Sequence, residues 1–353
     1  MISKTSIALA LAYPISATVI PLFPCTDGSN QGGFRCVQVM AITGNPAGAA
    51  DVPLIKQGRV PINTLSDDTI IHFPLIPSIG EAVGRVENLI ALPGHLAMEK
   101  WGDVVEDLAV IPTLIKRYIS PAGISLRSRR NIFVGLGFGS GMMHGNTRPL
   151  RSFALTDNFL ILNPRNEARD FCSAPDEIVF VPHPRNSRAW SLNVGGLRVV
   201  SPSDSVRRQA PANVEKFSID SFSRTDLIPH QMYDQLVRAI SMVPGVAVVE
   251  QLDGPVRRPA RITNCVGNFE HFPALEYRIT DDDGNHLITL LMDPESFIEP
   301  IQRADDMTGC ELNVSPTWDP QNYRLGVNLF KHNLVYFERN TDTTSRIGFC
   351  DPI

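Results

Sequence analysis

The stretch Phe217–Val237, which reads FSIDSFSRTDLIPHQMYDQLV, carries the clearest local structural pattern in the chain. Apolar and polar residues alternate over its first positions, as in a short strand, and this strand ends in the carboxylate of Asp220. Pro229 suits the first turn of a helix. Apolar side chains between Tyr233 and Ile240 then recur at helical spacing. The sequence therefore predicts a strand, an acidic turn and a helix over residues 229–242.

Short apolar segments separated by turn residues continue on both sides of this stretch. Downstream, Ala274–Thr280 and His286–Met292 flank the polar run Asp281–Asn285, which is typical of a β-hairpin. Upstream, apolar runs between residues 16 and 65 alternate with Gly, Asn, Asp and Pro. Many short elements with frequent turns predict a mainly β protein with a few short helices.

One upstream segment has a different pattern. Apolar residues from Trp101 to Ile111 fall at helical spacing and have acidic residues between them. This spacing predicts a helix over about residues 95–119, interrupted near Pro112. Its apolar stripe is interpreted as core packing.

The composition is that of an ordinary globular protein. The chain has 353 residues, of which 43% are hydrophobic and 20% charged, and this length fits two domains of about 150 residues each. A net charge of −5 and a pI near 5.9 argue against nucleic-acid binding and against an anionic membrane surface. No apolar run reaches the ~18 residues of a spanning helix, so no membrane segment is predicted.

The six cysteines are widely spaced and form no CxxC pair. Zinc-finger and HExxH spacings are also missing from the sequence, so no metal and no cofactor is predicted. An even number of cysteines suits disulfides in a secreted protein, and buried free thiols in a cytosolic protein are the alternative. At the N-terminus, residues 1–12 fit a short signal peptide, although residues 7–20 fit a buried strand pair equally well.

Several of these segments together resemble a known family. Phe217–Val237 looks like the second active-site loop and following helix of pepsin-like aspartic proteases, whose loop reads Asp-[Ser/Thr]-Gly-[Ser/Thr]. The downstream order of Cys265, the hairpin, Cys310 and Leu325-Gly326 is also similar, and Arg346–Cys350 resembles the ending of the plant nepenthesin and xylanase-inhibitor branch. The resemblance covers about residues 125–353. It implies a mainly β, bilobal pepsin-like fold.

This resemblance also implies a lobe division and a set of disulfides. The N-terminal β lobe is expected over residues 1–200, incomplete or divergent and with the helical insertion at about 95–119, and the C-terminal β lobe over residues 201–353. Cys265–Cys310 looks like the second-lobe disulfide of the family. By the same resemblance Cys350 pairs with Cys172, and Cys25 pairs with Cys36 in the first lobe.

Aspartic proteolysis needs two carboxylates that share one proton, one acting as base and the other as acid. In the second lobe the chain keeps Asp220 and Ser221 but has Phe222 in the place of glycine, followed by Ser223. In the first lobe, the family's spacing back from Cys25 puts Ser16 at the aspartate position. Asp220 is therefore expected to be a vestigial catalytic residue without its partner.

A second candidate for the first-lobe aspartate is Asp27, in the run Thr26-Asp27-Gly28-Ser29. Its residues are a transposed version of the motif, and Cys25 directly precedes it. A turn is the preferred interpretation of Asp27-Gly28, although an active dyad through Asp27 stays an alternative.

The favoured hypothesis is a catalytically inactive member of this fold that is secreted to the cell wall or apoplast. The resemblance implies a protein-binding inhibitor of microbial cell-wall glycosidases, with a secreted glycoside hydrolase as partner. Some members of this branch use a histidine close to the C-terminal cysteine. No histidine follows Cys350, which speaks against inhibition of xylanases in particular. The two alternatives are an active aspartic endopeptidase with a divergent motif and a structural or storage pseudo-protease.

Overall fold

The structure is a computed structural model of the whole chain. It describes residues 18–25, 35–44, 58–66, 69–73, 89–99, 108–119, 134–139, 151–162, 171–174, 178–202, 208–209, 214–250, 252–253, 256–257, 259–301, 309–339 and 344–352. The chain divides into two compact units. Unit 1 contains Met1–Phe171 and Tyr336–Asn340, and unit 2 contains Cys172–Val335 and Thr341–Ile353.

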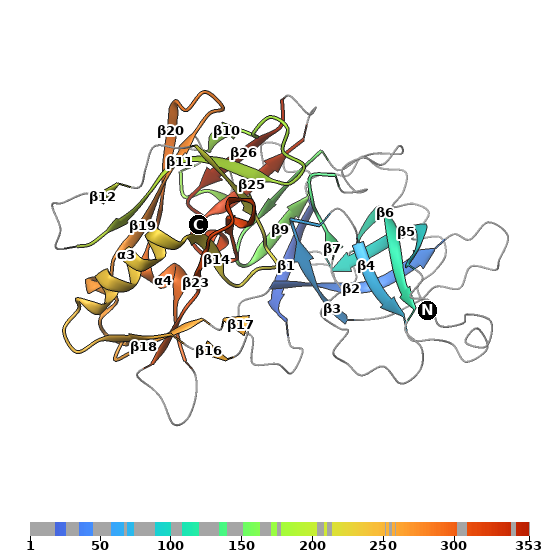
Figure 1. The fold of residues 1–353 in the computed structure, drawn as a ribbon. Helices are drawn as coiled ribbons and strands as arrows, with labels where there is room; N and C mark the ends of the chain where they lie inside the picture. The colour runs from blue at the N-terminus through green and yellow to red at the C-terminus, as the bar shows by residue number, and fades with distance from the viewer. Residues whose placement is uncertain are drawn as a thin grey trace. The chain divides into compact units, whose positions relative to one another are not determined.

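The described part of unit 1 is built from strands (Figure 1). These are β1 (Thr18–Pro24), β2 (Arg35–Gly44), β3 (Gly58–Asn63), β4 (Thr69–Phe73), β5 (Leu89–Glu99), β6 (Leu108–Ile119), β7 (Val134–Gly135), β8 (Ser152–Leu155) and β9 (Phe159–Leu162). Their order in the sheet is β8-β9-β1-β2-β5-β6-β4, and β3 pairs with both β2 and β7. Phe153 of β8 is fully buried and stacks on Phe337 with ring centroids 4.5 Å apart.

The predicted helix over residues 95–119 is wrong, because that region contains β5 and β6. These strands pair in antiparallel fashion along their whole length, from Leu89 opposite Tyr118 to Glu99 opposite Leu108. The apolar residues after Leu108 include several β-branched side chains and Pro112, which disfavour a helix interior and suit a strand. Trp101 and the acidic residues that suggested the helix lie outside the described residues.

Unit 2 combines two sheets and a hairpin with short helices. Its strands are β10 (Val179–Pro182), β11 (Ser191–Val200), β12 (Arg208–Gln209), β13 (Glu215–Ile219), β14 (Asp226–Pro229), β15 (Ala247–Val249), β16 (Leu252–Asp253), β17 (Val256–Arg257), β18 (Ala260–Thr263), β19 (Ala274–Thr280), β20 (His286–Met292), β21 (Ile298–Pro300), β22 (Cys310–Leu312), β23 (Val314–Thr317), β24 (Arg324–Leu325) and β26 (Arg346–Cys350). The larger sheet has the order β20-β19-β11-β13-β24-β14-β23, and the smaller has β15-β18-β22-β21. β25 (Leu334–Glu338) carries the chain from unit 2 into unit 1.

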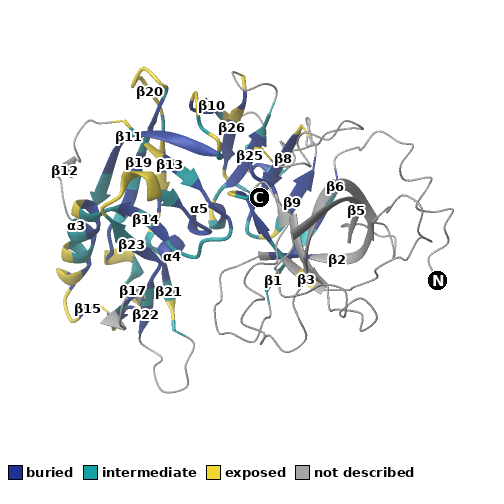
Figure 2. Cartoon of the chain, turned by 45° about the vertical axis from the view of Figure 1, so that its right-hand side comes forward, coloured by how far each residue is buried: buried dark blue, intermediate teal, exposed yellow. Residues whose placement is uncertain are grey.

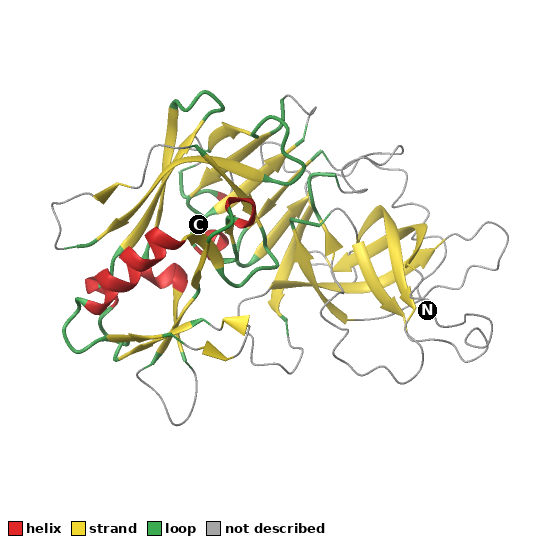
Figure 3. Cartoon of the chain, in the orientation of Figure 1, coloured by secondary structure: helices red, strands yellow, loops and turns green. Residues whose placement is uncertain are grey.

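The short helices of the described residues are α3 (His230–Ser241), α4 (Pro294–Phe297), α5 (Asn328–Lys331), η3 (Phe269–His271) and η4 (Pro320–Asn322), shown in red in Figure 3. The predictions of a strand ending at Asp220, a helix near 229–242 and the 274–292 hairpin are confirmed by β13, α3 and β19–β20. Among the described residues, no helix is both long enough and apolar enough to cross a membrane.

α3 shows how the sequence pattern produces a buried face. Met232, Tyr233, Leu236 and Ile240 are buried, and they pack toward β11, β14, β15 and β23. The polar side of the helix stays exposed, as the yellow segments of Figure 2 show. Since β14 ends at Pro229, α3 begins directly after the end of that strand.

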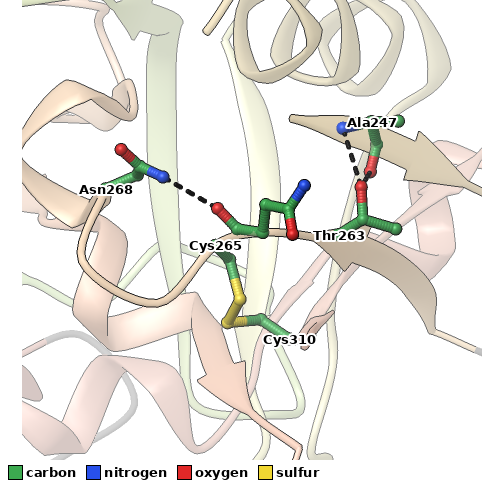
Figure 4. Close-up of a disulfide and its surroundings, with 6 residues drawn as sticks. Ala247, Thr263, Cys265, Asn268 and Cys310 are labelled. Carbon is green, nitrogen blue, oxygen red and sulfur yellow. Dashed lines mark hydrogen bonds between the residues drawn. A yellow bond between two sulfur atoms is a disulfide. The ribbon is translucent and has the colours of Figure 1, made fainter. Parts of the chain in front are cut away.

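All three predicted disulfides are present. Cys25–Cys36 lies in unit 1, whereas Cys172–Cys350 and Cys265–Cys310 lie in unit 2. Figure 4 shows Cys265 just after β18 and bonded to Cys310, the first residue of β22. Both sulfur-bearing residues are fully buried, so this bond fixes the smaller sheet from inside.

Candidate functional site

Asp220 lies directly after β13 in unit 2 and is 5% exposed. One carboxylate oxygen accepts a hydrogen bond from the backbone N–H of Phe222 at 3.0 Å. The other oxygen lies 3.1 Å from the guanidinium of Arg324 in β24. Burial raises the pKa of Asp220, while the Phe222 N–H and the Arg324 charge oppose that rise. The carboxylate predicted to be a vestigial catalytic residue is thus held by an arginine.

The turn after Asp220 tolerates phenylalanine. Phe222 is half-buried, and the described non-glycine residues with positive φ are Asn186 and Asn264. The backbone at Phe222 therefore does not need the conformational freedom of glycine. Ser221 is buried beside Asp220, and the hydroxyl of Ser223 donates to the carbonyl of Thr225 at 2.8 Å.

Gly326 packs tightly on this turn. β24 pairs in parallel with β13, which puts Leu325 opposite Ile219. The N–H of Val327 donates to the carbonyl of Ser223 at 2.8 Å. A Cβ on Gly326 would overlap that same carbonyl oxygen, so glycine is required here for close approach of two backbones.

Asp226, the first residue of β14, is a second buried carboxylate in this region and was missed by the sequence analysis. It is fully buried, and its Oδ1 accepts a hydrogen bond from the N–H of Gly326 at 2.5 Å. Burial raises its pKa from 3.8 to about 6, against the lowering effects of Gly326, Asn328 and Lys331. Asp226 follows the polar run Ser223-Arg224-Thr225, so no local sequence pattern marked it as buried.

An ion-pair network surrounds the base of this turn. Arg224 lies 2.9 Å from Glu299 and 2.8 Å from Glu311, and Lys331 lies 2.5 Å from the other oxygen of Glu299. Burial of Glu299 raises its pKa, but the two cations together lower it overall. The network connects the Asp220 turn, β21, β22 and α5, so it fixes the loop that carries Asp220.

The hydrogen-bond arrangement of this turn recurs in unit 1 around Asn63. β3 pairs in parallel with β7, with Ile62 opposite Val134 and Asn63 opposite Gly135. The side-chain oxygen of Asn63 accepts from the N–H of Leu65 at 2.9 Å and from that of Ser66 at 3.0 Å. Asn63 is 9% exposed. Both units therefore contain a short strand, a polar residue that caps its own turn, and a parallel strand with a glycine at its end (Gly135) or directly after it (Gly326).

The two turns also match residue by residue. Asn63-Thr64-Leu65-Ser66 in unit 1 corresponds to Asp220-Ser221-Phe222-Ser223 in unit 2. The carbonyl of Ser66 accepts from Gly137 at 2.8 Å, as the carbonyl of Ser223 accepts from Val327. Both turns keep the two hydroxyl positions of the pattern Asp-[Ser/Thr]-Gly-[Ser/Thr], and both have a large apolar residue in the place of its glycine. In unit 1 an amide replaces the carboxylate.

The Asn63 turn was not predicted, because the family's spacing back from Cys25 leads to Ser16 instead. Ser16 and Asp27 both lie outside the described residues, so their predicted roles stay predictions. The signal that would have found Asn63 is the internal repeat itself. An apolar strand followed by Asn-Thr-x-Ser, and later by Val134-Gly135, parallels the order seen from Asp220 to Leu325-Gly326.

These two turns have limited acid–base chemistry. An asparagine amide neither gains nor loses a proton in the pH range of carboxylates, so it cannot share one with a partner. Asp220 is titratable, but Arg324 stabilises its charged form. Asn63 therefore cannot serve as one carboxylate of a proton-sharing pair.

Comparison with solved structures defines the class of fold. The chain has the mainly β, bilobal pepsin-like fold. The solved structures similar to it include basic 7S globulin from soybean, with a TM-score of 0.60 and 13% sequence identity over 96% of this chain and 95% of that one. No family model and no curated protein sequence matches the chain.

Proposed function

We propose that this protein is a pepsin-fold protein without peptidase activity that acts by binding another protein. The supporting observation is the pair of similar turns, in which the side chain of Asn63 caps its own turn and Asp220 is bound to Arg324. We infer that Asn63, rather than Ser16, is the first-lobe counterpart of Asp220. With either residue there, the position lacks a carboxylate, which opposes the alternative of an active aspartic endopeptidase.

The favoured binding role is inhibition of a secreted glycoside hydrolase of the xylanase or xyloglucanase type. This role rests on the resemblance of the Cys265–Cys350 region to the plant xylanase-inhibitor branch. Three disulfides suit an extracellular location such as the cell wall or apoplast.

The test is inhibition of a panel of purified fungal and oomycete xylanases and xyloglucan-specific endoglucanases. We expect at least one enzyme to be inhibited stoichiometrically and to form a complex that elutes as one species in size-exclusion chromatography. Small chromogenic substrates should be used, so that binding of the polysaccharide itself cannot imitate inhibition. A folded protein that neither inhibits nor binds any enzyme of the panel would contradict the inhibitor role.

A structural or storage role is the second candidate. It is favoured by the similarity in fold to a protein named as a globulin. This role predicts accumulation of the protein to high abundance without a stoichiometric partner. Quantitative proteomics of the source tissue, together with the same chromatography, separates it from the inhibitor role.

A further inference from the structure

Trp318 is a large apolar side chain that the fold leaves open to solvent. It is 79% exposed, whereas Trp190, the other described tryptophan, is fully buried. Trp318 directly follows β23, which runs parallel to β14. It therefore lies beside the end of β14 that is farther from Asp226 and from the Asp220 turn. An isolated exposed apolar residue is common, so the argument depends on what holds and surrounds this one.

The register of two parallel strands positions the indole. β14 pairs with β23 so that Ile228 lies opposite Pro316 and Pro229 opposite Thr317. His230 directly follows β14 and Trp318 directly follows β23. Their rings stack with centroids 4.1 Å apart and an interplanar angle of 18°. His230 is held in turn by Asp234, one turn along α3, with 3.2 Å between Nδ1 and the carboxylate. One face of the indole is therefore supported by an oriented imidazole.

The turn after Trp318 adds polar groups next to the indole. Asp319 accepts from the N–H of Gln321 at 3.0 Å and from the side-chain amide of Asn322 at 2.9 Å. Asp319, Gln321 and Asn322 are all exposed, and Pro320 restricts the backbone between them. The η4 turn therefore presents ordered amide and carboxylate groups beside a flat apolar surface.

We propose that Trp318, with its η4 turn, is a binding platform for a neutral oligosaccharide. The C–H face of a pyranose ring is apolar and flat and can stack on an indole, while its hydroxyl groups need both donors and acceptors. A β-linked sugar with equatorial hydroxyls, as in glucan or xylan chains, exposes such a C–H face. The amides of Gln321 and Asn322 supply donors and acceptors together, and the supported indole loses little freedom on binding.

A basic side chain of a protein partner is the competing ligand, because the indole face also attracts cations. The platform favours the sugar, because the Asp319 carboxylate is already engaged by two donors of its own turn. Two of its acceptor sites are therefore occupied, which leaves fewer for the two parallel hydrogen bonds of a guanidinium.

The experiment uses the full chain and a panel of cello-, xylo- and manno-oligosaccharides together with a hepta-arginine peptide. Binding is followed by tryptophan fluorescence and isothermal calorimetry, and by retardation in native gels that contain soluble xylan or xyloglucan. We expect the β-linked gluco- or xylo-oligosaccharides to bind. Trp318→Ala should weaken that binding by about tenfold or more, Trp318→Phe by less, and Leu291→Ala, a matched exposed residue on β20, should leave it unchanged.

Circular dichroism establishes that Trp318→Ala is folded, which its exposure predicts. No binding to any sugar, or sugar binding that persists in Trp318→Ala, would overturn the proposal. Binding of the arginine peptide alone would overturn it in favour of a protein partner. The panel contains no enzyme, so its outcome is independent of the proposed inhibition of glycosidases.

Discussion

At the scale of single residues, Arg324 determines the chemistry of Asp220. The carboxylate is buried, and the guanidinium and the Phe222 N–H are its described partners at hydrogen-bond distance. A buried carboxylate that loses a charged partner pays a desolvation penalty that its remaining hydrogen bond does not offset. The pair therefore stabilises the turn, and the charge of Arg324 opposes the rise that burial causes in the pKa of Asp220.

Arg324→Ala should lower the free energy of unfolding at neutral pH by about 1–3 kcal/mol. Removal of the guanidinium raises the pKa of Asp220 further, so the loss should shrink at acid pH, where the carboxyl is protonated. Urea unfolding of the wild type, Arg324→Ala, Asp220→Ala and the double variant gives the coupling energy. A coupling indistinguishable from zero would show that the ion pair does not stabilise the turn.

Asp226 should make the protein more stable in mild acid. Its pKa is raised in the folded state from 3.8 to about 6, so the folded protein binds this proton more tightly than the unfolded chain. This proton contributes on the order of 3 kcal/mol to the free energy of unfolding. The contribution is fully present below the pKa of the unfolded chain, and it is lost as the pH rises through the pKa of the folded state.

Asp226→Asn keeps a side-chain oxygen for the Gly326 N–H and removes the titration. The difference in unfolding free energy between wild type and variant should therefore change between about pH 4 and pH 7, with the variant gaining relative to the wild type as the pH rises. Urea titrations at intervals across that window measure it. A difference that is independent of pH would contradict the assigned role of the Asp226 carboxyl.

At the scale of elements, the crossing of β24 over the Asp220 turn depends on glycine. Gly326→Ala brings a Cβ against the backbone carbonyl of Ser223, which cannot rotate away as a side chain can. We expect a loss of about 1–3 kcal/mol in the free energy of unfolding. Gly196→Ala in β11 is the matched control, since its nearest atom lies 3.9 Å from the added Cβ. Equal effects of the two substitutions would contradict the close approach.

The sequence predicted unit 2 better than unit 1 for a physical reason. Around α3 and the β19–β20 hairpin, local propensity, turn residues and burial all favour the same element. β5 and β6 pair with each other over eleven opposed residues, from Leu89 with Tyr118 to Glu99 with Leu108. Such non-local pairing overrides a local helical spacing of apolar residues.

Pairing between distant segments also limited what could be predicted of the candidate site. Asp220 could be predicted because its whole motif is contiguous in the sequence. Asn63 could not be recognised from its own segment, because an Asn-Thr-Leu-Ser run has no chemical signature of catalysis. Its correspondence to Asp220 depends on features far apart in the chain: the order of segments shared with residues 220–326, and the parallel pairing of β3 with β7.

At the scale of the whole molecule, the disulfides set much of the stability of unit 2. Cys265 and Cys310 close a loop with a sequence separation of 45, which corresponds to about 4 kcal/mol in the chain-entropy model. Cys265→Ala/Cys310→Ala should therefore lower the free energy of unfolding by several kcal/mol, as measured in urea. Peptide mapping without reduction should find the two residues linked. Free thiols at both positions in the native protein would contradict the pairing.

The proposed lack of peptidase activity depends on the Asn63 and Asp220 turns holding a single carboxylate, that of Asp220, which is bound by Arg324. The most direct measurement is hydrolysis of an unfolded protein substrate at acid pH by the wild type and by Asp220→Ala, with and without a transition-state-mimicking inhibitor of aspartic proteases. We predict no hydrolysis above background by either protein and no binding of the inhibitor. Hydrolysis by the wild type that is blocked by the inhibitor and lost in Asp220→Ala would contradict the account.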